Sequence, residues 1–121
     1  MARLKVRNPA RSSVLATDAC IADTSAARCV GLLRHRSLPP GEGLWIVPSE
    51  GIHTFGMKFP IDVVFLDRKK KVLKVRHSMV PRRLSLCLRA YSVLELPAGT
   101  IEATGTRHGD QLEFERLEET A

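Results

Sequence analysis

The sequence has no apolar run long enough to cross a membrane and no paired cysteine motif. A membrane-spanning helix needs about 18 or more consecutive apolar residues, and no stretch of the 121-residue chain approaches that length. The first residues do not lead into the apolar segment of a secretory leader. The three cysteines, Cys20, Cys29 and Cys87, are odd in number and lack CxxC spacing. We therefore expect a cytoplasmic protein with no membrane partner, no disulfide framework and no structural zinc site.

Motifs for covalent or metal chemistry are also missing. The sequence contains no G-x-S-x-G elbow and no cysteine-protease motif, which argues against a serine or cysteine hydrolase. The four histidines have no HExxH or similar ligand spacing, so we expect no metal and no cofactor. Aromatic residues make up only 5% of the chain, and the net charge is +6. That charge favours anionic partners but lacks the clustering typical of a dedicated nucleic-acid binder.

The composition is that of an ordinary globular chain. The apolar fraction is 44% and the charged fraction 26%, both close to the average for soluble domains. A length of 121 residues matches one domain of typical size. We expect a single domain over residues 1–121.

The clearest local pattern is a β-hairpin around a central apolar strand. Residues 61–66 are almost continuously apolar, which is typical of a strand covered on both faces. The charged run 67–71 predicts a solvated turn, and the alternation over 71–77 predicts the partner strand. If residues 52–58 are extended, His53, Phe55 and Met57 share one face, and residues 53–62 form a polar corner before the strand.

Two helices are predicted. Ala26, Cys29, Val30 and Leu33 are spaced as one helical face, which predicts a main helix over about 24–35. Gly31 would lie inside it, and we interpret this glycine as a sign of close packing against a neighbouring backbone. A short second helix is expected over about 99–104, followed by Gly105 as its left-handed C-terminal residue.

The remaining segments predict an α+β fold that is mainly β. Seven or eight short strands without repeated βα alternation favour a small, mostly antiparallel barrel or curled sheet with the main helix packed on it. Residues 79–89 have no clean period and predict an irregular crossing. The strands are expected near residues 4–8, 14–22, 44–47, 61–66, 71–77, 90–96 and 111–115.

Six motifs follow one another along the chain: Gly31-Leu32-Leu33-Arg34, Leu38 to Gly43, Ile52 to Asp62, Met79-Val80-Pro81, Leu94 to Gly99 and Gly109-Asp110. Together they resemble the domain of unknown function 192 family. The resemblance covers about residues 14–115 and implies a compact β-rich domain with one main helix, without an established reaction. Ser49 stands where some relatives carry a cysteine shortly before the Ile-His-Thr motif, which weakens a thiol mechanism.

Six residues are candidates for a ligand site. They are polar or adaptable side chains near the apolar strand 61–66: Arg34, Arg36, His53, Met57, Lys58 and Asp62. His53 is either a core histidine bonded to a backbone carbonyl or a pocket histidine with a pKa tuned near neutrality. Asp62 either accepts backbone amides at the 58–60 corner or pairs with Lys58, Arg34 or Arg36. Lys58 projects into solvent or toward a bound anion.

Other acidic and basic residues have simpler interpretations. Glu95, between two leucines, is expected to face away from them or to pair with an arginine in an architectural role. Asp110 is expected to bond the amides of its own turn. The basic run 68–71 is a solvated hairpin turn that could also contact phosphates.

These residues favour a noncatalytic module over an enzyme. The first hypothesis is a binding or accessory domain for a small polar or anionic ligand around His53, Lys58 and Asp62. The first alternative is a hydrolase-like enzyme in which His53 is the base and Asp62 orients it. The second alternative is a basic module that binds RNA or an acidic protein partner.

Overall fold

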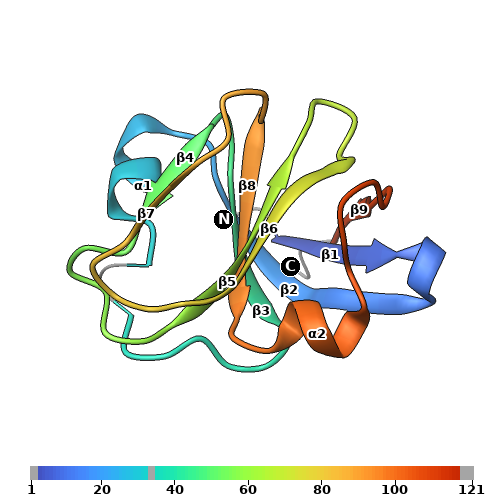
Figure 1. Ribbon diagram of the computed structural model, residues 1–121, viewed down its shortest axis with the longest axis horizontal. Helices are drawn as coiled ribbons and strands as arrows, with labels where there is room; N and C mark the ends of the chain where they lie inside the picture. The colour runs from blue at the N-terminus through green and yellow to red at the C-terminus, as the bar shows by residue number, and fades with distance from the viewer. Residues whose placement is uncertain (1–2, 33–34, 118–121) are drawn as a thin grey trace.

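The chain folds around a seven-stranded mixed sheet, seen in a computed structural model that describes residues 3–32 and 35–117 (Figure 1). The side chains of Cys29 and Val30 are outside this description. Neighbouring strands are antiparallel except for one parallel pair, β2 with β3, whose crossover connection carries α1 (Ser25–Val30). The order across the sheet is β6 (Val72–Met79), β5 (Ile61–Leu66), β8 (Ser92–Pro97), β3 (Glu42–Ile46), β2 (Ser13–Ala22), β1 (Arg3–Asn8) and β9 (Glu113–Arg116).

Smaller elements complete the fold. A two-stranded antiparallel ribbon is formed by β4 (Gly51–His53) and β7 (Leu84–Leu86). A short 3-10 turn, η1 (Pro9–Arg11), joins β1 to β2, and α2 (Thr100–Thr104) follows β8. Neither described α-helix is long and apolar enough to span a membrane.

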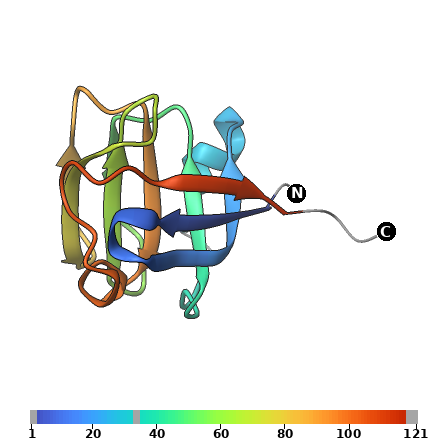
Figure 2. The same cartoon turned by 90° about the vertical axis from the view of Figure 1, so that its right-hand side faces the viewer.

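The large sheet is strongly curled but stays open. Figure 2 shows β9 (red) beside β1 (blue), away from β5 and β6. A bridge between Lys71 and Gln111 links the two ends of the sheet, and beside it the Val72 N–H donates to the Asp110 carbonyl. The predicted α+β class, with a mainly antiparallel curled sheet, is confirmed, and of the two expected forms it is the open one.

The predicted hairpin is confirmed as β5 and β6. All six residues of β5 are buried, because β5 is paired on both edges and covered on both faces. Alternate side chains on a strand point to opposite faces, so the core has two parts. The α2-side core contains Val64, Leu66, Leu94, Leu96 and Ile101, among others. The α1-side core contains Leu32, Ile46, Ile52, Met57, Val63 and Val93, among others.

The main helix is shorter than predicted. It begins after Thr24, whose hydroxyl oxygen accepts the Ala27 N–H, and it ends at Val30 rather than at residue 35. Gly31 has φ +49° and ψ −127°, and its N–H donates to the Ala27 carbonyl. A Cβ on Gly31 would lie 3.9 Å from the nearest atom outside its immediate neighbours. The glycine is therefore present for its backbone angles, not for close packing, and it ends the helix where the periodic pattern runs on. The predicted extension also falls partly on residues 33–34, outside the described residues.

The second helix is confirmed, and residues 52–58 are extended only as far as His53. Strand β4 ends at His53, and residues 54–60 form turns. Thr54 is fully buried, and its hydroxyl donates to the Val80 carbonyl at 2.7 Å. This long-range hydrogen bond holds the chain where it turns, and the alternation ends there. The same contact holds the stretch 79–89, which was predicted to be irregular but includes β7.

Candidate functional site

A cavity of about 370 Å³ lies beneath α1, and we refer to it as the α1 cavity. Its apolar wall comes from the α1-side core, from the buried side chains of Leu32, Ile46, Ile52 and Met57. Its polar lining comes from several elements: Ser25 and Arg28 on α1, Ser49 before β4, His53 on β4 and Glu95 on β8. A hollow of this size, apolar with a few polar groups, is typical of a small-molecule site.

Glu95 is the most unusual group in the α1 cavity. It lies two residues after Val93 on β8, so its side chain faces the α1-side core together with Val93. The residue is 3% exposed, and its Oε1 atom has no hydrogen-bond partner among the described residues. Burial raises the pKa of the Glu95 carboxyl to about 7, because a carboxylate is poorly solvated there. A buried carboxyl without a fixed cation is a perturbed group of the kind found in functional sites.

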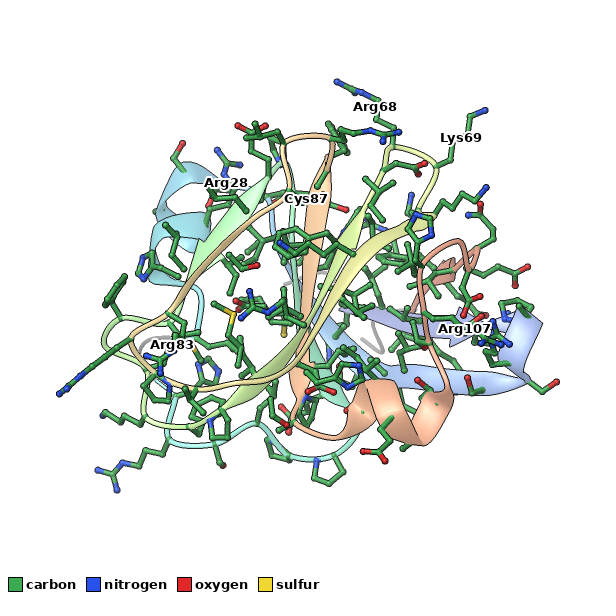
Figure 3. All side chains as sticks on the ribbon, viewed as in Figure 1. Arg28, Arg68, Lys69, Arg83, Cys87 and Arg107 are labelled. Atoms are coloured by element: carbon green, nitrogen blue, oxygen red, sulfur yellow. The ribbon has the colours of Figure 1, made fainter. Side chains whose placement is uncertain are left out.

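Arg28 holds the helix against the strand connection. Its Nη1 donates to the Asp23 carbonyl at 3.0 Å and to the Val47 carbonyl at 3.3 Å, and its Nη2 donates to Ser25 Oγ. Figure 3 shows Arg28 where α1 approaches the end of β4. The guanidinium therefore supplies positive charge to the cavity lining, while its hydrogen bonds join the start of α1 to the β3–β4 connection.

Ser49 fixes the polar side of the cavity next to β4. Its N–H donates to the Tyr91 carbonyl, and its hydroxyl donates to the Gly51 carbonyl at 2.8 Å. The two contacts fix the corner between Pro48 and Gly51, which both line the cavity. Ser49 therefore has a structural role at this corner.

Two predicted site residues, His53 and Met57, line the α1 cavity. His53 is exposed, and its ring lies 5.8 Å from the Phe55 ring. It is therefore not a core histidine. Met57 is buried in the α1-side core, so His53 and Met57 do not lie on one common face, as they would in an extended segment.

The predicted cations lie elsewhere or outside the description. Lys58 and Arg36 are exposed, and neither belongs to the described lining of the α1 cavity. Arg34 lies outside the described residues, so its place at the site stays a prediction.

Asp62 is separated from the cavity by the sheet. It alternates with Val63 and faces the α2-side core. Its Oδ1 accepts the Ser78 N–H and its Oδ2 accepts the Ile101 N–H, both at 2.8 Å. These amides belong to β6 and the first turn of α2, not to the 58–60 corner. Asp62 thus fastens two elements and shares no site with His53.

Glu95 and Arg28 are the cavity residues that sequence reasoning missed. A signal for Glu95 was present: an acid inside the strand Val93 to Leu96 must be buried if both faces of that strand are covered. Glu95 was expected to face away from the two leucines or to pair with an arginine, and it does face away from them, but the face it shares with Val93 was not recognised as buried. Arg28 has no comparable signal, since its contacts depend on how α1 meets the β3–β4 connection.

Residues of the basic turn after β5 make contacts within the protein. Asp67 Oδ1 accepts the N–H groups of Lys69 and Lys71, as expected of a tight turn. Arg68 lies 4.2 Å from the centre of the Tyr91 ring, and Lys70 lies 5.4 Å from the centre of the Trp45 ring. In the described part of the chain, no group of three or more His, Cys, Asp or Glu residues is arranged to hold a metal.

Comparisons with known proteins extend the sequence resemblance. The model of the DUF192 family, described as "Uncharacterized ACR", matches residues 6–114. A UPF0127 protein of Thermococcus sibiricus is 33% identical over 107 residues, covering 82% of this chain and 67% of that protein. A UPF0127 protein of Pyrococcus furiosus is 29% identical over 120 residues, covering 91% of this chain and 97% of that protein.

Two crystal structures share the fold. A protein of unknown function from Novosphingobium aromaticivorans has a TM-score of 0.79 at 22% identity, covering 92% of this chain and 83% of that one. A putative transcription regulator from Sinorhizobium meliloti has a TM-score of 0.81 at 21% identity, covering 93% and 92%. At these identities the likeness concerns the fold alone.

Proposed function

The chain belongs to the DUF192 family, whose description carries no reaction, and from its α1 cavity we propose that it is a noncatalytic module that binds a small polar ligand. The ligand's body would contact Ile46, Ile52 and Met57. Its polar group would meet Glu95 at the buried end, and His53 would border the exposed end.

The observation that carries this proposal is the unsatisfied carboxyl of Glu95. Burying a carboxylate without a cation or hydrogen bonds is unfavourable, and the raised pKa of Glu95, about 7, reflects that penalty. A ligand that donates a hydrogen bond or brings a positive charge would remove the penalty. An orphaned acceptor that faces a cavity is therefore better explained by a ligand than by packing.

The position of Glu95 also narrows the ligand's chemistry. A protonated amine or another N–H donor complements a carboxylate, and the apolar wall favours an aliphatic or aromatic body. An anionic group beside Glu95 would be repelled whenever the carboxyl is ionised. We therefore favour a small amine over the anionic ligand that the sequence suggested, since Lys58 and Arg36 lie outside the described lining.

A fragment titration tests this function. Backbone amide shifts are followed by NMR while n-butylammonium, n-butanol and butyrate are added separately to the full chain. We expect shifts around Ile52, Met57 and Glu95 with n-butylammonium, and an affinity about tenfold lower in Glu95→Gln, because the charge pair is lost. Butyrate should bind most weakly of the three.

Glu102→Gln is the matched control, because Glu102 is an exposed acid on α2 far from the described cavity lining. It should leave the n-butylammonium affinity unchanged. Equal affinity in wild type and Glu95→Gln, or a preference for butyrate, would reject the proposal.

A second candidate, acid–base catalysis, is favoured by one observation. A carboxyl with a pKa of about 7 is well matched to proton transfer at neutral pH, and His53 lines the same cavity. Glu95 and His53 therefore replace His53 and Asp62 as the candidate acid–base pair, since Asp62 lies on the other face of the sheet. Once a ligand is identified, its incubation with the protein tests for catalysis. Chemical conversion of the ligand that is lost in Glu95→Gln and His53→Asn would establish an enzyme, and recovery of the ligand chemically unchanged would exclude catalysis.

A further inference from the structure

The outer face of the β4–β7 ribbon is apolar and open to solvent. In an antiparallel pair, residues directly opposite each other share a face. Leu84 lies opposite His53 and Leu86 opposite Gly51, whereas Ile52 and Ser85 form the buried face. Leu84 and Leu86 are both more than half exposed. The Leu86 side chain lies over Gly51, where an added Cβ would collide with it.

Apolar side chains continue beyond both ends of the ribbon. The Phe55 ring is 5.8 Å from the His53 ring, and Val80 is held nearby because its carbonyl accepts the hydroxyl of Thr54. Leu88, two residues beyond β7, is 75% exposed. We call this set the ribbon patch. It contains Phe55, Val80, Leu84, Leu86 and Leu88, which are all but one of the large apolar residues exposed in the described chain.

Arginines flank the ribbon patch. Arg82 and Arg83 are placed by backbone hydrogen bonds to Thr54, and Arg89 follows Leu88. All three are exposed, and Figure 3 shows Arg83 beside the start of β7, on the side away from the seven-stranded sheet's β9 end. Residues 50–90 contain ten Lys or Arg against three Asp or Glu, but four of the ten, Arg68 to Lys71, lie in the turn after β5. Lys74 and Arg76 lie beside β7, where they donate to the Leu86 carbonyl and to Ser85 Oγ, and add to the positive charge around the patch.

We propose that the ribbon patch docks on the surface of an anionic lipid bilayer. Leucine and phenylalanine beside lysine and arginine are typical of surfaces that insert at the lipid interface, and clustered cations are attracted to anionic headgroups. Leucine is under-represented among the hot spots of protein interfaces, where Trp and Tyr dominate, and the patch has neither. The sequence predicted no membrane partner because no apolar span exists; the patch was missed because its residues are dispersed over 55–88.

Vesicle flotation tests the docking. The full chain is mixed with vesicles of phosphatidylcholine alone or with about one-third phosphatidylglycerol, and we expect about tenfold more binding to the anionic vesicles at low salt. Binding should fall as salt is raised. The variants L84S/L88S and R83E/R89E should each lower it about tenfold or more, because they remove inserted apolar groups and headgroup contacts respectively.

Val14→Ser is the matched control, since Val14 is an exposed apolar residue on β2, outside the patch. It should bind vesicles as the wild type does. Thermal unfolding of each variant confirms that the fold is kept. Equal wild-type binding to both vesicle types, or full binding by L84S/L88S, would overturn the proposal. Binding to polyglutamate instead of vesicles would also overturn it and assign the patch to an acidic protein partner.

Discussion

Arg28 and Glu95 line the same cavity without pairing with each other. The Arg28 guanidinium donates to the carbonyls of Asp23 and Val47 and to Ser25, whereas the raised pKa of Glu95 comes from burial. A direct ion pair would lower that pKa. The cavity thus contains a cation committed to the scaffold and a carboxyl available to a ligand.

Glu95→Gln should stabilise the free protein at alkaline pH. The folded-state pKa of Glu95, about 7, lies above its ordinary value of 4.5, so the folded chain holds the proton more tightly than the unfolded chain. Stability therefore falls as pH rises from 4.5 to about 7 and stays lower above that. The substitution should raise the free energy of unfolding by about 3 kcal/mol near pH 9 and change it little near pH 4.

Urea denaturation at both pH values measures this difference, with Glu102→Gln as the control at an exposed acid. If the stability difference between Glu95→Gln and wild type is no larger at pH 9 than at pH 4, the carboxyl is not desolvated in the folded state.

Asp62→Ala should destabilise the fold without weakening ligand binding. The carboxylate accepts two backbone N–H groups, from Ser78 and Ile101, and is fully buried. Its removal leaves both amides unpaired, at a loss of about 3 kcal/mol or more, and Asp62→Asn should lose less because one acceptor remains. Denaturation gives the stability. A folded Asp62→Ala chain that no longer binds n-butylammonium would instead place Asp62 in the site.

Gly31→Ala should destabilise the C-terminal end of α1. The backbone angles at Gly31, φ +49° and ψ −127°, are ones that a residue with a Cβ rarely adopts, at a strain of roughly 1 to 3 kcal/mol. Because Gly31 and Leu32 border the α1 cavity, fragment affinity should fall as well. Thermal unfolding and the fragment titration measure the two effects, and an alanine variant as stable as wild type would contradict the helix ending at this residue.

Asp110→Asn should make the protein less sensitive to acid. The Arg11 guanidinium, with Asn8 and the Arg107 N–H, lowers the pKa of Asp110 from 3.8 to about 2. A lowered pKa means that the stabilising contribution is complete above pH 4 and is lost as pH falls through this range. Acid unfolding followed by circular dichroism should show that the variant loses less stability than wild type as the pH falls from 4 to 2. The control is Asp23→Asn, at an exposed acid. Identical acid curves for Asp110→Asn and wild type would argue against the Arg11 contact.

Much of the fold could be predicted because its strongest elements carry local patterns. Apolar continuity identified β5, alternation identified β6, and the glycine after residue 104 marked the end of α2. The failures arose from one backbone conformation and one tertiary contact. Gly31 ends α1 against the periodic pattern, and buried Thr54 stops β4 through its hydrogen bond to the Val80 carbonyl.

The site was harder to predict than the fold for a related reason. His53 and Met57 were found because they lie near the apolar strand in sequence and in space. Asp62 was grouped with them by sequence distance, although alternation along β5 turns it to the other face. Glu95 reaches the cavity through the pairing of β8 with β5 and β3. The local pattern indicates that this acid is buried, but the cavity that it lines depends on this long-range pairing.

The central claim is that the Glu95 carboxyl is the buried anchor for a ligand. A carbon-13 NMR titration of the Glu95 side chain, assigned with Glu95→Gln, measures its pKa directly in the free protein and with saturating n-butylammonium. We predict a pKa of about 7 in the free chain and a clear decrease when the amine is bound, because the added cation favours the carboxylate. A pKa that stays unchanged while the amine binds, or one near 4.5 in the free chain, would contradict the claim.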